Sequence, residues 1–209
     1  MIHPKNIANF ISHLKKVAKE HNVKLHLPQE KFIDDGDGRL CNGYFDDDPD
    51  PILAVAIGKD EKEWLPILVH EFGHMNQWIE NHPYWTNLRG PKGEASDLLD
   101  QWLKGKEFTK KTINSFTKAL INVEYDCEVR TLKEIKKFNL PIDSEVYIQK
   151  SLSYVLFYHV VRKTKQWYTP GLEPYMIPEV FSAMPKTMDI NVQEPDPQLI
   201  EIIEKHCIK

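Results

Sequence analysis

The sequence is poor in cysteine and has no long uninterrupted apolar stretch. It holds three cysteines, Cys41, Cys127 and Cys207, which are far apart and form no Cys-x-x-Cys pair. We therefore expect reduced thiols, and neither a disulfide framework nor a zinc site built from cysteines. No segment reaches the roughly 18 apolar residues that a membrane span needs, and residues 1–5 do not begin a signal peptide. The sequence thus indicates a cytoplasmic protein without a membrane partner.

An excess of positive charge is also absent. The formal net charge is -4 over 209 residues, and the isoelectric point is about 6.1. Such a balance offers no electrostatic footprint for nucleic acid, so we expect no nucleic-acid partner. With 41% hydrophobic and 28% charged residues, the chain has the composition of a globular protein with a sizeable core. Nothing in the composition indicates an oligomeric state.

Apolar spacing predicts an α+β fold that is mostly helical, with a small sheet near the N-terminus. We expect helices over residues 6–22, 60–79, 94–103, 110–138, 144–167, 179–183 and 197–206, and strands over residues 24–27, 40–45 and 52–57. Asp60 should cap the second helix with Glu63 as its capping-box partner, and residues 81–92 should form a loop. We expect a first domain over residues 1–140, with a C-terminal helical extension over residues 141–209 packed on it.

The most informative motif is His70-Glu71-Phe72-Gly73-His74, within the second predicted helix. Residues four apart lie on the same helix face, so His70 and His74 can bind one metal ion. Glu71 lies beside the first histidine and can act as general base on a water bound to that ion. Apolar residues surround the motif, and unpaired polar side chains are costly in a buried helix. This favours a Zn²⁺ site over a surface cluster without a ligand.

A catalytic zinc ion usually has three protein ligands and one open position, so a third ligand must come from elsewhere. The predicted helix over residues 110–138 offers Glu124 and Glu128, which lie four apart on one face. We expect Glu124 to be the third ligand and Glu128 to accept a hydrogen bond from the Nδ1–H of His70. Glu94 is the competing ligand. An exposed acidic helix face remains the alternative interpretation of Glu124 and Glu128.

The combination of His70-Glu71-Phe72-Gly73-His74 with a later glutamate resembles the gluzincin zinc metallopeptidases. The segment Glu124-Tyr125-Asp126-Cys127-Glu128 is similar to their Glu-x-x-Ala-Asp segment, except that Cys127 replaces Ala and Glu128 replaces Asp. The resemblance covers residues 40–135 and implies a zincin-like catalytic domain with one zinc ion per chain. It also implies a strand before the motif helix, antiparallel to bound substrate, which residues 52–57 match. In thermolysin-like members the glutamate lies at the distance of Glu94 from His74.

The activity implied by this resemblance is zinc-dependent hydrolysis of a peptide bond in a peptide or protein substrate. Glu71 would take a proton from the zinc-bound water and pass it to the leaving amine. Related enzymes add a tyrosine or histidine that stabilises the oxyanion. The candidates for that catalytic role here are His159, Tyr154, Tyr158 and Tyr168.

Other classes of function remain open. A zincin-like interaction module could be stabilised by zinc and be catalytically silent, although a purely structural zinc site has no use for Glu71. A DNA-associated metalloprotease would be expected to carry a third histidine ligand and basic or zinc-ribbon elements, and the sequence shows neither. A protease that acts on a single protein target fits the same residues.

Overall fold

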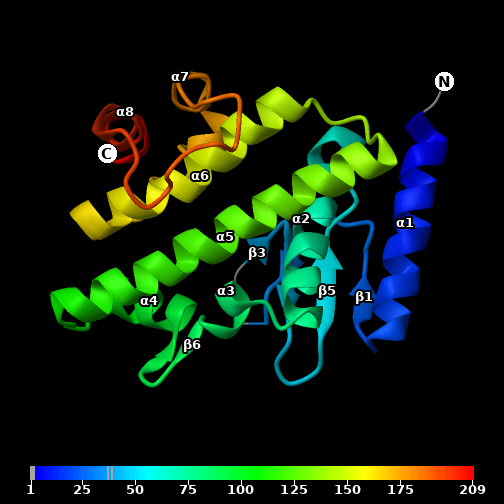
Figure 1. Cartoon of the computed structure of the whole chain (residues 1–209), viewed down its shortest axis with the longest axis horizontal. Coiled ribbons are helices and arrows are strands. Elements are labelled where there is room, and N and C mark those ends of the chain that lie inside the picture. Colours follow the sequence, from blue (N-terminus) through cyan, green and yellow to red (C-terminus); the bar gives the residue numbers. More distant parts are fainter. Residues whose placement is uncertain (1–2, 37, 39) are drawn as a thin grey trace. The chain divides into compact units, whose positions relative to one another are not determined.

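The computed structural model describes residues 3–36, 38 and 40–209. The prediction that residues 1–5 do not begin a signal peptide includes Met1 and Ile2, which lie outside the described residues. Helices dominate and the strands are short, which confirms the expected α+β, mostly helical class (Figure 1). By its internal contacts the chain divides into two compact units, Met1–His82 with Val129–Ile142 and Pro83–Glu128 with Asp143–Lys209. This division differs from the expected 1–140 and 141–209, because the long helix α5 (Lys110–Phe138) runs from the second unit into the first.

The two units hold different sets of elements. The first unit contains α1 (His3–Glu20), β1 (Lys24–His26), β2 (Ile33–Asp34), β3 (Leu40–Cys41), β4 (Gly43–Asp46), β5 (Ile52–Val55), α2 (Glu61–Ile79) and the C-terminal end of α5. The second unit contains α3 (Pro83–Thr86), β6 (Arg89–Gly90), β7 (Gly93–Glu94), α4 (Ala95–Leu103), most of α5, α6 (Ser144–Thr164), the 3-10 helix η1 (Pro174–Met176), α7 (Pro178–Phe181) and α8 (Pro197–Cys207). In the described part of the chain, no helix combines the length and apolar character that a membrane crossing requires.

The main sheet of the first unit has the strand order β1-β5-β4. β5 pairs in parallel with β1, Leu53 opposite Leu25, and antiparallel with β4, Leu53 opposite Phe45. β5 is therefore the central strand, and both of its edges are used. The expectation that residues 52–57 would align a bound substrate is wrong for this reason, because an extended peptide adds to an outer strand.

The predicted strand over residues 40–45 is two strands in different sheets. β3 pairs with β2, whereas β4 begins at Gly43 and pairs with β5. Gly43 lies so close to α2 that a Cβ atom there would stand 2.9 Å from the Cγ2 atoms of Ile67 and Val55. A side chain at this position would push β4 away, so the close contact between β4 and the motif helix depends on glycine.

Aromatic side chains from α1, α2 and α5 meet in the core of the first unit. The Phe10 ring lies edge to face against Phe72, with 5.6 Å between ring centroids, and against Phe138, with 5.5 Å. The hydroxyl of Thr131 on α5 is buried and lies 3.5 Å from the carbonyl oxygen of Val69 on α2. The motif helix is thus fixed against α1, β4, β5 and the last turns of α5.

The start of α2 and residues 81–92 differ from the sequence predictions, whereas the start of α6 agrees with them. The Asp60 side chain makes no capping hydrogen bond and lies 3.8 Å from the Lys62 ammonium, so the expected capping box with Glu63 is wrong. The loop prediction for residues 81–92 is wrong in part, because α3 and the β6–β7 hairpin form there. The start of α6 is as expected, since the Asp143 carboxylate accepts backbone N–H groups of its first turn.

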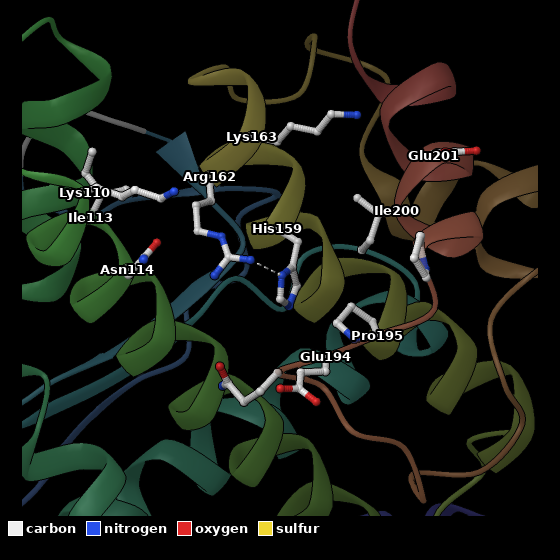
Figure 2. Close-up of a pocket in the computed structure, with 12 residues that line it drawn as sticks. Lys110, Ile113, Asn114, His159, Arg162, Lys163, Glu194, Pro195, Ile200 and Glu201 are labelled. Atoms are coloured by element: carbon white, nitrogen blue, oxygen red, sulfur yellow. Dashed lines mark hydrogen bonds between the residues drawn. The ribbon is translucent and has the colours of Figure 1, made fainter.

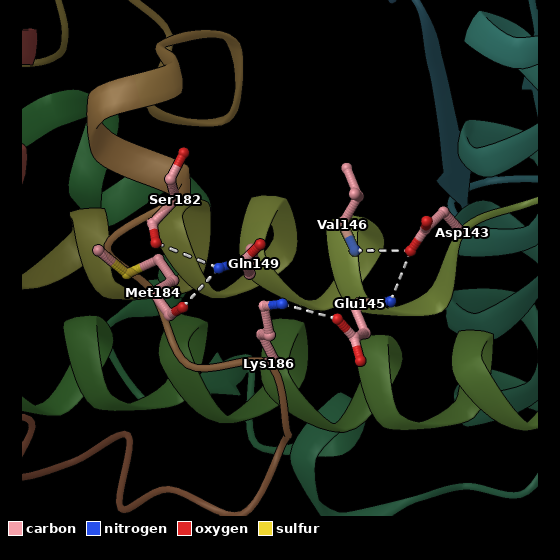
Figure 3. A network of polar contacts seen from close by, with 7 residues as sticks. All are labelled: Asp143, Glu145, Val146, Gln149, Ser182, Met184 and Lys186. Atoms are coloured by element: carbon pink, nitrogen blue, oxygen red, sulfur yellow. Dashed lines mark hydrogen bonds and ion pairs between the residues drawn. The ribbon is translucent and has the colours of Figure 1, made fainter.

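In the second unit, α6 packs against η1, α7 and α8 and is buried along most of its length. Figure 3 shows how the segment after α7 is held against it. The Gln149 amide donates to the carbonyl oxygens of Ser182 at 3.2 Å and Met184 at 2.8 Å. The Lys186 ammonium lies 2.9 Å from the Glu145 carboxylate. Polar bonds from one buried amide therefore replace regular secondary structure in fixing this segment.

Candidate metal centre

The motif residues share the buried middle of α2. Glu71 is 8% and His74 is 9% exposed, and His70 is half-buried. The imidazole rings of His70 and His74 stand edge to face, with 4.7 Å between centroids and an interplanar angle of 88°. A ring nitrogen of one histidine lies within 4.8 Å of a ring nitrogen of the other. Nitrogens that share a zinc ion at ~2.1 Å stand ~3.4 Å apart, which falls within this limit.

Gln77 orients His74. The Nδ1–H of His74 donates to Gln77 Oε1 at 2.8 Å, and the Gln77 side chain is fully buried. Because Oε1 can only accept, this bond places the proton on Nδ1, so Nε2 is the ring nitrogen that carries the lone pair, as in a ligating histidine. Such an acceptor behind a ligating histidine is the usual support of a metal site. Sequence reasoning missed Gln77, whose only signal was a polar residue three positions after His74 on an apolar helix.

The carboxylate of Glu71 lies within electrostatic reach of β3. Burial raises the pKa of the Cys41 thiol, and the carboxylates of Asp35 and then Glu71 raise it further. Glu71 therefore lies within electrostatic range of β3, the second strand of the small β2–β3 hairpin.

In the second unit, Glu128 is buried on α5, at 4% exposure, and its partner is a tyrosine of α6. The hydroxyl of Tyr147 donates to Glu128 Oε2. Burial raises the pKa of Tyr147 well above the ordinary value, and the Glu128 carboxylate raises it further, so the phenol stays protonated and donates. That Glu128 supports His70 stays a prediction, and the Tyr147 bond accounts for one of the Glu128 carboxylate oxygens.

Glu124 lies one helical turn before Glu128 and is half-buried, with its Oε2 atom buried. A second tyrosine of α6 lies near it. Burial raises the pKa of Tyr154 well above the ordinary value, and the Tyr158 hydroxyl and the Glu124 carboxylate add to the effect. The Tyr154 and Tyr158 hydroxyl oxygens are 3.5 Å apart. Tyr154, one of the tyrosines proposed for the oxyanion, thus lies within electrostatic reach of Glu124.

Glu94, the competing ligand, belongs to a surface hairpin. It ends β7, and its side chain is 38% exposed. One carboxylate oxygen lies 3.6 Å from Arg89 Nε across the hairpin, and the other accepts from the Ser96 hydroxyl at 3.1 Å. Through these two contacts, Glu94 fixes the β6–β7 hairpin to the start of α4.

His159 has hydrogen bonds at both ring nitrogens. Its Nε2 lies 2.8 Å from the carbonyl oxygen of Val192, and its Nδ1 lies 3.1 Å from a terminal nitrogen of Arg162. The side chain is 5% exposed. Since neither nitrogen is left to stabilise an oxyanion, these bonds favour a structural role for His159 over the expected catalytic one.

The sequence-predicted residues thus form two groups. His70, Glu71 and His74 lie together on α2 in the first unit, and Glu124 and Glu128 lie together on α5 in the second unit. No protein-family model, curated protein or solved structure matches this chain. A function must therefore be argued from the side chains of α2, α5 and α6.

Proposed function

We propose that the chain is a zinc-dependent peptidase that uses His70 and His74 as metal ligands and Glu71 as general base. One observation carries the proposal: His74 is held by Gln77 in the tautomer that a metal ligand needs, beside a second histidine and a buried carboxylate. The nitrogen donors fit Zn²⁺, which prefers imidazole and carboxylate ligands.

We propose Glu124 as the third ligand because Glu124-Tyr125-Asp126-Cys127-Glu128 resembles the gluzincin segment whose first acid binds zinc. Glu124 lies on α5, one turn before Glu128, and its Oε2 atom is buried. Glu94 is a weaker candidate because its carboxylate is bonded within the surface hairpin.

Zinc bound at such a site would supply a Lewis acid that lowers the pKa of a water and polarises a carbonyl group. The residues of the chain do the proton transfer. Glu71 accepts a proton as the water oxygen bonds to the carbonyl carbon, and it delivers that proton to the amide nitrogen as the C–N bond breaks. The products are a carboxylic acid and an amine, and Glu71 returns to its ionised form.

An extended peptide suits the sheet next to α2. β4 is the outer strand on that side, and Gly43 brings it into close contact with the motif helix. A peptide that adds to the sheet would pair with β4, since β5 is enclosed between β1 and β4. Main-chain pairing of this kind favours peptide substrates over small amides.

The direct test is Glu71→Gln, with zinc content and casein hydrolysis as readouts. We expect zinc to stay and hydrolysis to fall by about 10²- to 10⁴-fold, because only the proton acceptor is removed. Glu63→Gln is the matched control, as an exposed carboxylate at the start of the same helix, and should change neither readout. Unchanged hydrolysis by Glu71→Gln would refute the assignment of the base.

Wild-type protein that holds zinc but hydrolyses no peptide would instead identify the catalytically silent, zinc-stabilised module. The third ligand is tested separately by metal retention. We expect Glu124→Ala to lose zinc and Glu94→Ala to keep it, and the opposite result would reverse the assignment. Because we propose Glu124 and not the nearby thiol of Cys127 as the third ligand, Cys127→Ser should leave the absorption spectrum of the cobalt-substituted protein unchanged. Loss of a thiolate charge-transfer band in that variant would make the sulfur the ligand.

A further inference from the structure

A cavity of about 700 Å³ opens in the second unit, and no step of the proposed hydrolysis uses it (Figure 2). Its walls are the first turn of α5, the last turn of α6 and the segment that leads into α8. The volume is typical of small-molecule sites, which run from about 300 to 1,000 Å³. Figure 2 shows Arg162 reaching from α6 into the space between these walls, toward His159.

His159 at the cavity wall fixes the Arg162 guanidinium. The Val192 carbonyl can only accept, so the Nε2 of His159 carries the proton and the Nδ1 keeps its lone pair. That lone pair accepts from Arg162 at 3.1 Å. Burial lowers the pKa of His159, and the Arg162 charge lowers it further, which keeps the ring neutral and able to accept. The arginine is thus oriented by a neutral group that leaves its positive charge uncompensated.

The cations of the cavity differ in how their charge is balanced. Lys163 lies 2.6 Å from the Glu204 carboxylate. In the part of the chain that the structure describes, no carboxylate lies within ion-pair distance of Arg162 or of Lys110, which stands on the first turn of α5. Lys110 also marks the positive end of the α5 dipole. The two cations without an acid partner therefore face one space.

The remaining lining defines the ligand more closely. Ile113 and Ile200 add aliphatic surface, and Glu194 and Glu201 add exposed negative charge. These two acids disfavour a multiply charged anion such as phosphate, whereas one carboxylate can be held by Arg162 through paired N–H bonds. We propose that this cavity binds a monocarboxylate joined to an aliphatic group. Such a group occurs in free branched-chain acids and at the carboxyl end of a peptide with an aliphatic last residue.

The test is a titration of the full-length chain, followed by calorimetry and by backbone amide shifts. The probes are N-acetyl-leucine, 4-methylpentanoate, N-acetyl-leucinamide and inorganic phosphate. We expect both carboxylates to bind and to shift the amides around residues 110–114 and 193–200, and the neutral amide and phosphate to bind at least about tenfold more weakly. Tighter binding of N-acetyl-leucine would identify a peptide end, and tighter binding of 4-methylpentanoate a free acid. Failure of both carboxylates, or equal binding of the amide, would overturn the proposal.

Variants locate the site. Arg162 is exposed, so Arg162→Gln should fold normally and lower carboxylate affinity by about tenfold or more. Lys205→Gln is the matched control, because Lys205 is an exposed cation of α8 that does not line the cavity, and it should leave the affinity unchanged. His159→Asn tests whether His159 positions Arg162. In folded His159→Asn protein, the preference for carboxylate over amide should fall. Wild-type carboxylate affinity in Arg162→Gln would refute the role of Arg162 in binding. An unchanged preference for carboxylate over amide in His159→Asn would refute the positioning role of His159.

Discussion

Replacement of Gln77 by leucine should weaken zinc binding without touching a ligand. Leucine fills nearly the same volume but cannot accept the His74 Nδ1–H bond, which is 2.8 Å long and formed by a fully buried amide. Loss of such an acceptor lowers metal affinity by about 10- to 100-fold, or about 1.4 to 2.8 kcal/mol. The metal-free protein should lose about 1 to 3 kcal/mol of unfolding free energy as well, because His74 keeps a buried donor with that partner gone.

The assay is competition with a zinc chelator on folded protein, together with urea unfolding of the metal-free form. Gln77→Glu keeps an acceptor and should retain wild-type zinc affinity or exceed it. Gln149→Leu is the matched control, since Gln149 is a buried glutamine of the second unit whose side-chain amide donates to the backbone carbonyls of Ser182 and Met184. It should lower stability and leave zinc affinity unchanged. If Gln77→Leu bound zinc as tightly as the wild type, the orientation argument for His74 would be refuted.

Three further predictions concern the packing and polar contacts around the proposed sites. Gly43→Ala should lower the unfolding free energy by about 1 to 3 kcal/mol, because its Cβ would lie 2.9 Å from an Ile67 methyl, whereas Gly90→Ala, with no atom nearer than 3.8 Å, should be neutral in the same urea titration. Tyr147→Phe should cost about 1.5 to 3 kcal/mol, since it removes a donor from a buried carboxylate, and a loss below about 0.5 kcal/mol would contradict that reading. The pKa of His159 is lowered mainly by burial, so the folded value lies below the ordinary 6.5. The stability that neutral His159 contributes is therefore present above pH 6.5 and is lost as the pH falls through 6.5 toward the folded pKa. Urea unfolding should show the stability gap between wild type and His159→Asn shrinking from pH 8 to pH 5, and a constant gap would count against it.

The long helices could be predicted from sequence because their signals are local. The bounds of α5 and the start of α6 follow from regular apolar spacing interrupted by Pro141 and restarted at Asp143. The motif residues of α2 were visible for the same reason, as spacing on one helix is a property of the chain alone. The central place of β5 could not be predicted, because which strands flank it depends on contacts between distant segments.

The details of the site were harder to predict. Gln77 has no special spacing signal, and only burial shows that its amide must bond something inside the protein. The partner of Glu128 is a tyrosine on another helix, which no pattern in the α5 sequence indicates. The β6–β7 hairpin escaped prediction because each strand is a single pair of residues, too short for an alternating pattern.

Zinc content of the purified protein tests the central claim most directly. After dialysis against metal-free buffer, elemental analysis should find about one zinc ion per chain in the wild type and almost none in the His70→Ala and His74→Ala variants. Circular dichroism on the same samples should report folded protein. A wild type without zinc that also fails to bind added zinc, or histidine variants that retain the wild-type amount, would contradict the account.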